Sequence, residues 1–65
     1  MEVGQTVYTV NNKTGDVDSW EYDGAFPIKG ELLLRLINGK NQCYLPARCV
    51  FKCKSEAKRV AELHR

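Results

Sequence analysis

The stretch Glu31–Pro46 constrains this chain most, because it has the pattern of a β-hairpin closed by a short turn. Asn38 and Gly39 stand between two runs of strand-forming residues. A two-residue type I′ turn needs positive φ at both central positions, which glycine adopts freely and asparagine better than most residues. The sequence therefore predicts strands at 31–37 and 40–46, paired across an Asn38-Gly39 turn.

Counting outward from this turn gives the expected strand register, in which Leu34 lies opposite Cys43. Successive side chains of a strand alternate between its two faces, so the hairpin has one predominantly apolar face. We expect that face to join the hydrophobic core, and its members are Leu32, Leu34, Leu36, Cys43 and Leu45. The opposite face is mixed and carries Leu33, Ile37 and Tyr44 beside Arg35 and Gln42.

The rest of the chain divides at clusters of turn-forming residues into further short strands and one helix. Strands are expected at 3–10, 17–22, 31–37, 40–46 and 48–51. From Lys54 onward the apolar residues recur at helical spacing, which predicts a helix at 54–64 with either Cys53 or Ser55 as its N-cap. A chain of 65 residues makes one domain, 1–65. We expect a mainly β fold, a small SH3-like barrel of about five antiparallel strands with one C-terminal α-helix.

Several segments resemble a broad group of short, mostly uncharacterised proteins from bacteria and their phages. The segments are Val3-Gly4, Val7-Tyr8-Thr9-Val10, Trp20, Tyr44-Leu45-Pro46 and the closing run Val50-Phe51-x-Cys53-x-x-Glu56-Ala57. The resemblance implies one small SH3-like β-barrel followed by a short helix. The resemblance does not point to any activity.

The three cysteines and the single histidine do not show the spacing of a metal site. Structural zinc sites usually combine cysteine pairs two to four residues apart, and here only Cys49 and Cys53 come close to that spacing. Cys43 is expected in the core, and His64 is expected about three helical turns from Cys53. An odd number of cysteines also fits poorly with a secreted disulfide scaffold. We therefore predict reduced thiols, no bound metal and no cofactor.

Catalytic patterns are missing from the sequence: it has no Ser/His/Asp arrangement, no pair of carboxylates placed for acid–base chemistry and no glycine-rich phosphate loop. We therefore expect a non-enzymatic interaction module that binds another protein, as an accessory or inhibitory factor of bacterial or phage origin. Its expected contacts are aromatic residues with acidic residues between them: Trp20, Tyr22, Phe26, Asp18, Glu21 and Asp23.

A nucleic-acid-binding barrel is the alternative, because basic residues gather toward the C-terminus. The residues for that role are Arg35, Arg48, Lys52, Lys54, Lys58 and Arg59. The strand edges expected at 25–28 and 48–51 also leave a homodimer open. The sequence shows no signal peptide and no apolar run long enough for a membrane span, so we expect a cytoplasmic protein without membrane contact.

Overall fold

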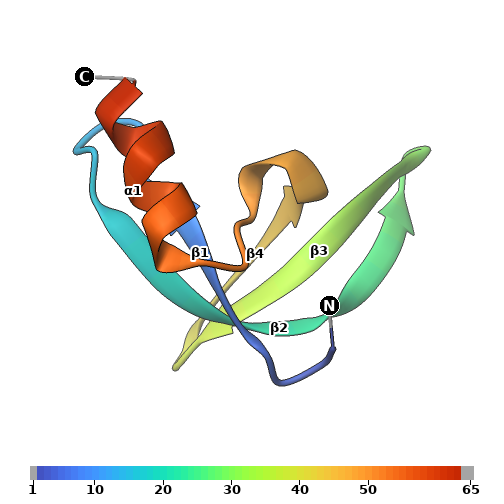
Figure 1. Cartoon of the computed structure of the whole chain (residues 1–65). Helices are drawn as coiled ribbons and strands as arrows, with labels where there is room; N and C mark the ends of the chain where they lie inside the picture. The colour runs from blue at the N-terminus through green and yellow to red at the C-terminus, as the bar shows by residue number, and fades with distance from the viewer. Residues whose placement is uncertain (1, 64–65) are drawn as a thin grey trace.

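A computed structural model describes residues 2–63 and shows an antiparallel sheet followed by a C-terminal helix (Figure 1). The sheet has four strands, which lie side by side in chain order: β1 (Thr6–Val10), β2 (Val17–Ile28), β3 (Glu31–Asn38) and β4 (Asn41–Pro46). A short 3-10 helix, η1 (Ala47–Cys49), and the helix α1 (Lys54–Leu63) complete the order. The sheet is open within the described residues, since no strand ladder joins β1 to β4. The fold is therefore mainly β with one C-terminal helix, as expected.

The strand β2 is longer than predicted, because it continues through Asp23-Gly24 and Pro27 to Ile28. A β-bulge lies between Tyr22 and Ala25, and Gly24 takes a φ of 117° there. The register places Pro27 opposite Leu32, one residue beyond the hydrogen-bonded pair that closes the turn. The nitrogen of Pro27 therefore points away from β3, and its missing N–H costs no ladder bond.

The fifth strand predicted at 48–51 is wrong. After Pro46 the chain forms η1, where the N–H of Val50 donates to the carbonyl of Ala47 at 3.1 Å. Val50 and Phe51 follow in extended conformation, but only Phe51 pairs with a strand, as an isolated antiparallel bridge to Tyr8 with two hydrogen bonds of 2.8 Å. The 3-10 turn uses the residues that a fifth strand would need.

The predicted register of the central hairpin is wrong by two residues. Gly39 and Lys40 are the central turn residues, so Leu34 lies opposite Leu45. Gly39 has a φ of 61° whereas Lys40 has no positive φ, which matches the type II′ preference for glycine at the first central position. Positive φ at both central residues occurs instead at Lys29 and Gly30, between β2 and β3. A shift of two residues leaves every side chain on its predicted face.

The hydrophobic core lies on the face that was predicted for the hairpin leucines. Its buried residues are Val7, Tyr22, Leu34, Leu36 and Val50, with Trp20, Cys43 and Leu45 packed against them. Leu32 was also expected there but is 57% exposed, because the β4 ladder ends where Pro46 pairs with Leu33.

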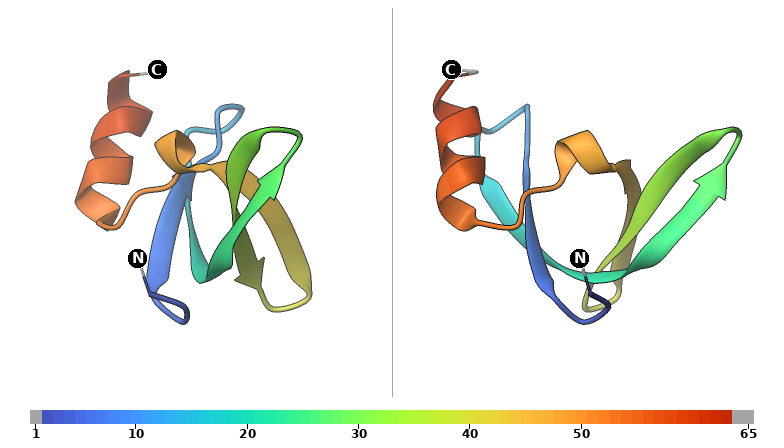
Figure 2. Two further views of the ribbon diagram at one scale, coloured as in Figure 1. Left: turned by 90° about the vertical axis from the view of Figure 1, so that its right-hand side faces the viewer. Right: turned by 45° about the vertical axis from the view of Figure 1, so that its right-hand side comes forward.

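The helix α1 packs mainly on β1 and less on β2, with Ala57 and Ala61 buried. It begins at Lys54, so Cys53 occupies the N-cap position, and residue 64 of the predicted helix lies outside the described residues. Figure 2 (left) shows α1 and β4 on opposite sides of the molecule.

Candidate functional site

Of the three aromatic residues predicted to contact a partner, Tyr22 belongs to the core and Trp20 packs against it. Tyr22 is only 8% exposed and is part of the buried cluster. Trp20 is half-buried against the same cluster, and its indole N–H donates a 2.9 Å hydrogen bond to Oγ1 of Thr9. The prediction that Tyr22 faces solvent is wrong and Trp20 is only partly accessible, because their strand face is the one that the hairpin leucines also occupy.

The third predicted aromatic residue, Phe26, is 41% exposed and lies on the opposite face of the sheet. The predicted acidic residues are distributed over both faces as well. Asp18 is on the face of Trp20, whereas Glu21 and Asp23 are on the face of Phe26. The six residues therefore do not form one surface.

The structure instead brings Phe26 together with apolar side chains of three neighbouring strands. Phe26 and Ile28 come from β2, Leu33 from β3 and Tyr44 from β4. We call these four residues the outer aromatic face. Three of them are well exposed: Phe26 at 41%, Ile28 at 37% and Tyr44 at 42%. The rings of Phe26 and Tyr44 meet edge to face, with centroids 6.5 Å apart and an interplanar angle of 79°, a favourable aromatic geometry.

The bulge in β2 positions the ring of Phe26. Gly24 precedes Phe26 by two residues on the same strand, and a Cβ atom at Gly24 would lie 3.4 Å from the ring. The ring therefore lies over the glycine in ordinary van der Waals contact. The φ of 117° at Gly24 is one that residues with a side chain rarely adopt. Glycine at this position thus provides both the backbone bend and the space beside the ring.

Arg35 crosses the outer aromatic face and connects its strands. Its Nη2 donates to Oε1 of Gln42 in β4 at 3.1 Å, and its Nε lies 3.4 Å from Oδ2 of Asp23 in β2. The Nε atom is buried and has no hydrogen-bond partner of good geometry, so the contact with Asp23 is mainly electrostatic. The charge of Arg35 is therefore compensated within the chain.

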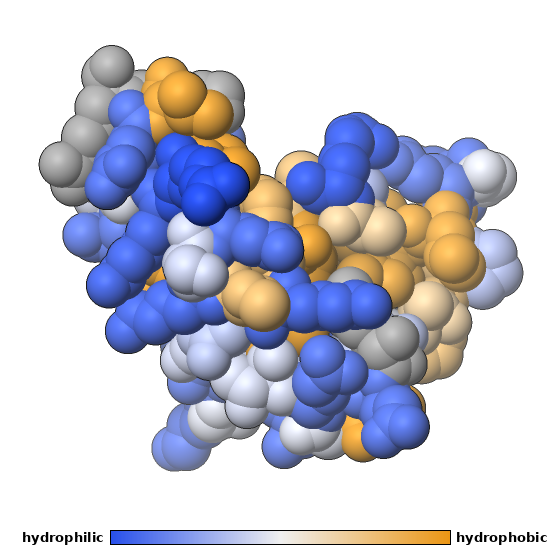
Figure 3. Space-filling view, in the orientation of Figure 1, coloured by the Kyte–Doolittle hydropathy of each residue, from blue (hydrophilic) through white to orange (hydrophobic). Residues whose placement is uncertain are grey.

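The end of the β2–β3 hairpin extends past β4 as an arm, at the right of Figure 1. Apolar side chains occupy both faces of this arm: Ile28 belongs to the outer aromatic face, and Leu32 lies on the other. Figure 3 shows hydrophobic residues gathered over this part of the molecule. The sequence indicated an edge segment at 25–28 and a turn at Lys29-Gly30, but not that the two together would extend past β4 with apolar side chains on both faces.

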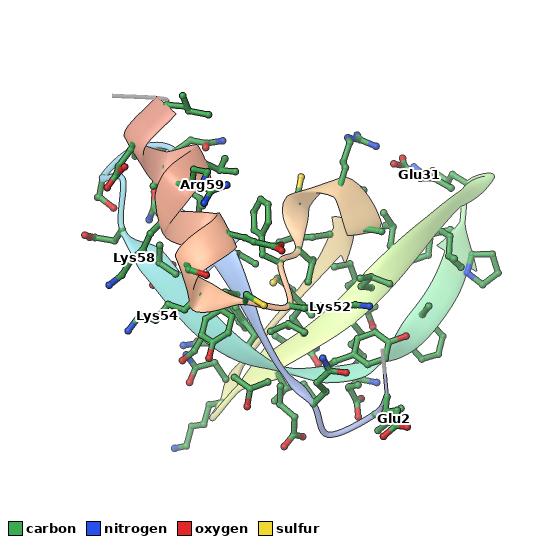
Figure 4. All side chains as sticks on the ribbon, viewed as in Figure 1. Glu2, Glu31, Lys52, Lys54, Lys58 and Arg59 are labelled. Atoms are coloured by element: carbon green, nitrogen blue, oxygen red, sulfur yellow. The ribbon has the colours of Figure 1, made fainter. Side chains whose placement is uncertain are left out.

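The basic residues of the nucleic-acid alternative divide into two groups. Arg35 and Arg48 are each paired with an acid, and Nη1 of Arg48 lies 3.1 Å from Oε1 of Glu31. The other four are exposed and have no ion pair in the part of the chain that the structure describes: Lys52, Lys54, Lys58 and Arg59. Lys54 and Lys58 extend from the same side of α1, while Lys52, which precedes the helix, points the other way (Figure 4).

The cysteines lie in different surroundings. Cys43 is half-buried, and desolvation by burial raises the pKa of its thiol. Cys49 and Cys53 are exposed. No group of three or more His, Cys, Asp or Glu side chains within residues 2–63 is arranged to hold a metal ion, and His64 lies outside that range. The absence of a bound metal stays a prediction.

None of the helices in residues 2–63 is long and apolar enough to cross a membrane. No protein-family model, curated protein or solved structure was found to match this chain. The resemblance to small bacterial and phage proteins stays an expectation from the sequence.

Proposed function

We propose that this chain is a non-enzymatic module that binds another protein through the outer aromatic face. The observation that carries the proposal is the exposed pair Phe26 and Tyr44, which stands beside Ile28 on a rigid sheet. Large rings on a fixed backbone supply contact area at little entropic cost, and aromatic residues are enriched at the centre of protein interfaces. The bulge and the Arg35 contacts hold this surface in place without a partner.

The proposal includes the finer features expected from the sequence. The order of four strands, a 3-10 turn and a return of the chain to β1 at Phe51 supports an SH3-like arrangement. The accessory or inhibitory role of bacterial or phage origin, and the lack of enzymatic activity, belong to the same proposal. An accessory factor of this kind acts by occupying a surface of its partner.

Replacement of Phe26 tests the proposal. Immobilised parent protein and Phe26→Ser protein are compared for the proteins that each captures from a lysate of the cells that express it, quantified by mass spectrometry. A protein captured by the parent should be depleted on Phe26→Ser and retained on the matched surface variant Lys58→Ser. Equal retention on both variants would contradict a role of the outer aromatic face.

Nucleic-acid binding is the second candidate, and the four exposed cations around the start of α1 favour it. Two observations weigh against it. Arg35 and Arg48 are neutralised by Asp23 and Glu31. The shallow cavity beside Lys54 and Lys58 is also lined by two acids, Asp16 and Glu62.

A salt titration with mixed-sequence oligonucleotides decides between the candidates. Binding driven by phosphate contacts is tightest at low salt. The parent protein should show no measurable binding there. Tight binding that weakens steeply with added salt and is lost in Lys54→Ala/Lys58→Ala would favour the alternative.

A further inference from the structure

Within residues 2–63, the sheet has a two-residue open edge at Glu31 and Leu32 of β3, beyond the end of β4, and three other open stretches. Two of these three are protected against pairing with another strand. The outer edge of β1 is contacted by Phe51, whose backbone is hydrogen-bonded to Tyr8. The distal edge of β2 contains Pro27, which offers no N–H on the side away from β3. Both devices are common ways in which proteins avoid edge-to-edge association. The edges expected from sequence to support a dimer, 25–28 and 48–51, are therefore poor candidates.

The third edge, β4, has no such protection from Asn41 to Leu45. This run contains no charged residue and no proline. Asn41 pairs with Asn38 next to the two-residue turn, and that pair is hydrogen-bonded in a hairpin of this kind. The alternation along the ladder then directs the backbone N–H and C=O of Gln42 and Tyr44 away from β3. Neither N–H forms another hydrogen bond within residues 2–63.

We propose that β4 pairs antiparallel with β4 of a second copy of this chain, about a two-fold axis through Cys43. In that register Gln42 of one copy faces Tyr44 of the other, so all the outward N–H and C=O groups of both residues are satisfied. A register centred on Tyr44 would place Gln42 opposite Pro46, which has no N–H to donate. A register centred on Gln42 would place Tyr44 opposite Lys40 in the turn.

The distribution of charge favours a second copy as the occupant of this edge. Of the charged residues near β4, Arg35 is paired with Asp23 and Arg48 with Glu31. Lys40, in the turn before β4, has no ion pair within residues 2–63, but in the proposed register it faces Pro46 of the second copy and not another cation. The helix α1, which carries the exposed cations Lys54, Lys58 and Arg59, lies on the opposite side of the molecule from β4 (Figure 2, left). Two copies of a chain with net charge +2 can therefore join at β4 without bringing their basic segments together. Under two-fold symmetry the same edge supplies both partners, so Gln42 and Tyr44 of one copy meet Tyr44 and Gln42 of the other.

Pairing at β4 would join two four-stranded sheets into one of eight strands. Tyr44 of each copy would lie beside the junction, and the two outer aromatic faces would become continuous. The dimer would then present two copies of the surface proposed to bind a partner. Self-association does not require that surface, so Phe26→Ser should leave it unchanged.

Sedimentation equilibrium of the full chain tests the association. The parent should show a concentration-dependent species of twice the 7.4 kDa chain mass. Gln42→Pro removes an outward N–H and leaves the β3–β4 ladder bonds intact, so it should weaken dimerisation roughly tenfold or more. Gln42→Thr loses the same side chain but keeps the N–H, and it should dimerise like the parent. A parent protein that stays monomeric up to millimolar concentration would overturn the proposal.

Disulfide cross-linking tests the register. Facing residues of a pair without mutual hydrogen bonds have Cα atoms about 4.5 Å apart, within the range that a disulfide spans. In the variant Cys49→Ser/Cys53→Ser, the two Cys43 thiols should lose two protons and two electrons to copper phenanthroline and form one intermolecular disulfide. Cys43→Ser, which keeps the exposed thiols, should not give this rapid cross-link. A dimer in sedimentation that fails to cross-link through Cys43 would overturn the proposed pairing.

Discussion

Cys43 differs from the other two cysteines in its surroundings. Its side chain is half-buried against the core, and burial raises the pKa of its thiol because the charged thiolate is poorly solvated there. A raised pKa in the folded state means that the thiol ionises at higher pH than in the unfolded chain. Its contribution to folding stability is therefore fully present below the ordinary thiol pKa and is lost as the pH rises through the folded-state pKa.

The same difference predicts an order of reactivity. Alkylation requires the thiolate, so exposed Cys49 and Cys53 should react with iodoacetamide before Cys43 does, with the largest contrast at neutral pH. Peptide mass spectrometry of samples quenched at intervals, from about pH 7 to pH 10, measures the three rates. The unfolded chain in urea is the control and should lose the contrast. A Cys43 that reacts first in the folded protein would contradict its placement.

Leu34 and Leu32 have the same residue type and lie on the same face of β3, but only Leu34 is covered. Leu34 is 5% exposed and Leu32 is 57% exposed. Leu34→Ala should lower the free energy of unfolding by about 2–5 kcal/mol, because it removes buried methyl groups and leaves a cavity. Leu32→Ala should lower it by less than about 1 kcal/mol. Urea denaturation measures the free energy of unfolding of each variant. Equal decreases for the two variants would contradict a β4 ladder that ends at Pro46 and leaves Leu32 uncovered.

At the scale of elements, the turn between β2 and β3 carries a local strain. Lys29 has a φ of 51°, which is unfavourable for a residue with a long side chain. Asparagine tolerates this conformation better, so Lys29→Asn should raise the free energy of unfolding by roughly 0.5–1 kcal/mol. Lys40→Asn, in the other hairpin turn where φ is not positive, is the control and should give no such gain. A lower melting temperature for Lys29→Asn than for the parent would contradict the turn conformation.

The sequence predicted correctly those strands and helices that are specified by the spacing of apolar residues within the segment itself. The alternation of Leu32, Leu34 and Leu36 indicated β3 and its core face, and the spacing of Ala57 and Ala61 indicated the buried stripe of α1. The fifth strand was mispredicted because Arg48-Cys-Val-Phe51 is compatible with a strand or with a 3-10 turn followed by one bridge. The choice depends on Pro46 and on contacts with β1, which lie outside the segment.

At the scale of the whole molecule, the candidate site was harder to predict than the fold. The face that each strand residue occupies follows from alternation, but its exposure depends on where the neighbouring strands end and which element covers them. Tyr22 was expected in solvent and is in the core, whereas Tyr44 is exposed beside Phe26. The bulge at Asp23-Gly24 also changes the phase of β2, so Phe26 lies on the face opposite Tyr22. The exposure of each ring thus depends on segments that are distant in the sequence, which local patterns do not reveal.

The register of β3 and β4 supports the whole account, because it places Tyr44 beside Arg35, directs the outward groups of Gln42, and defines the end of the ladder at Pro46. Nuclear Overhauser contacts between Hα protons measure it directly, since such protons approach closely only in facing residues without mutual hydrogen bonds. The structure predicts strong Hα–Hα contacts for Arg35 with Tyr44 and for Ile37 with Gln42. Strong contacts for Leu34 with Cys43 and for Leu36 with Asn41 would contradict it.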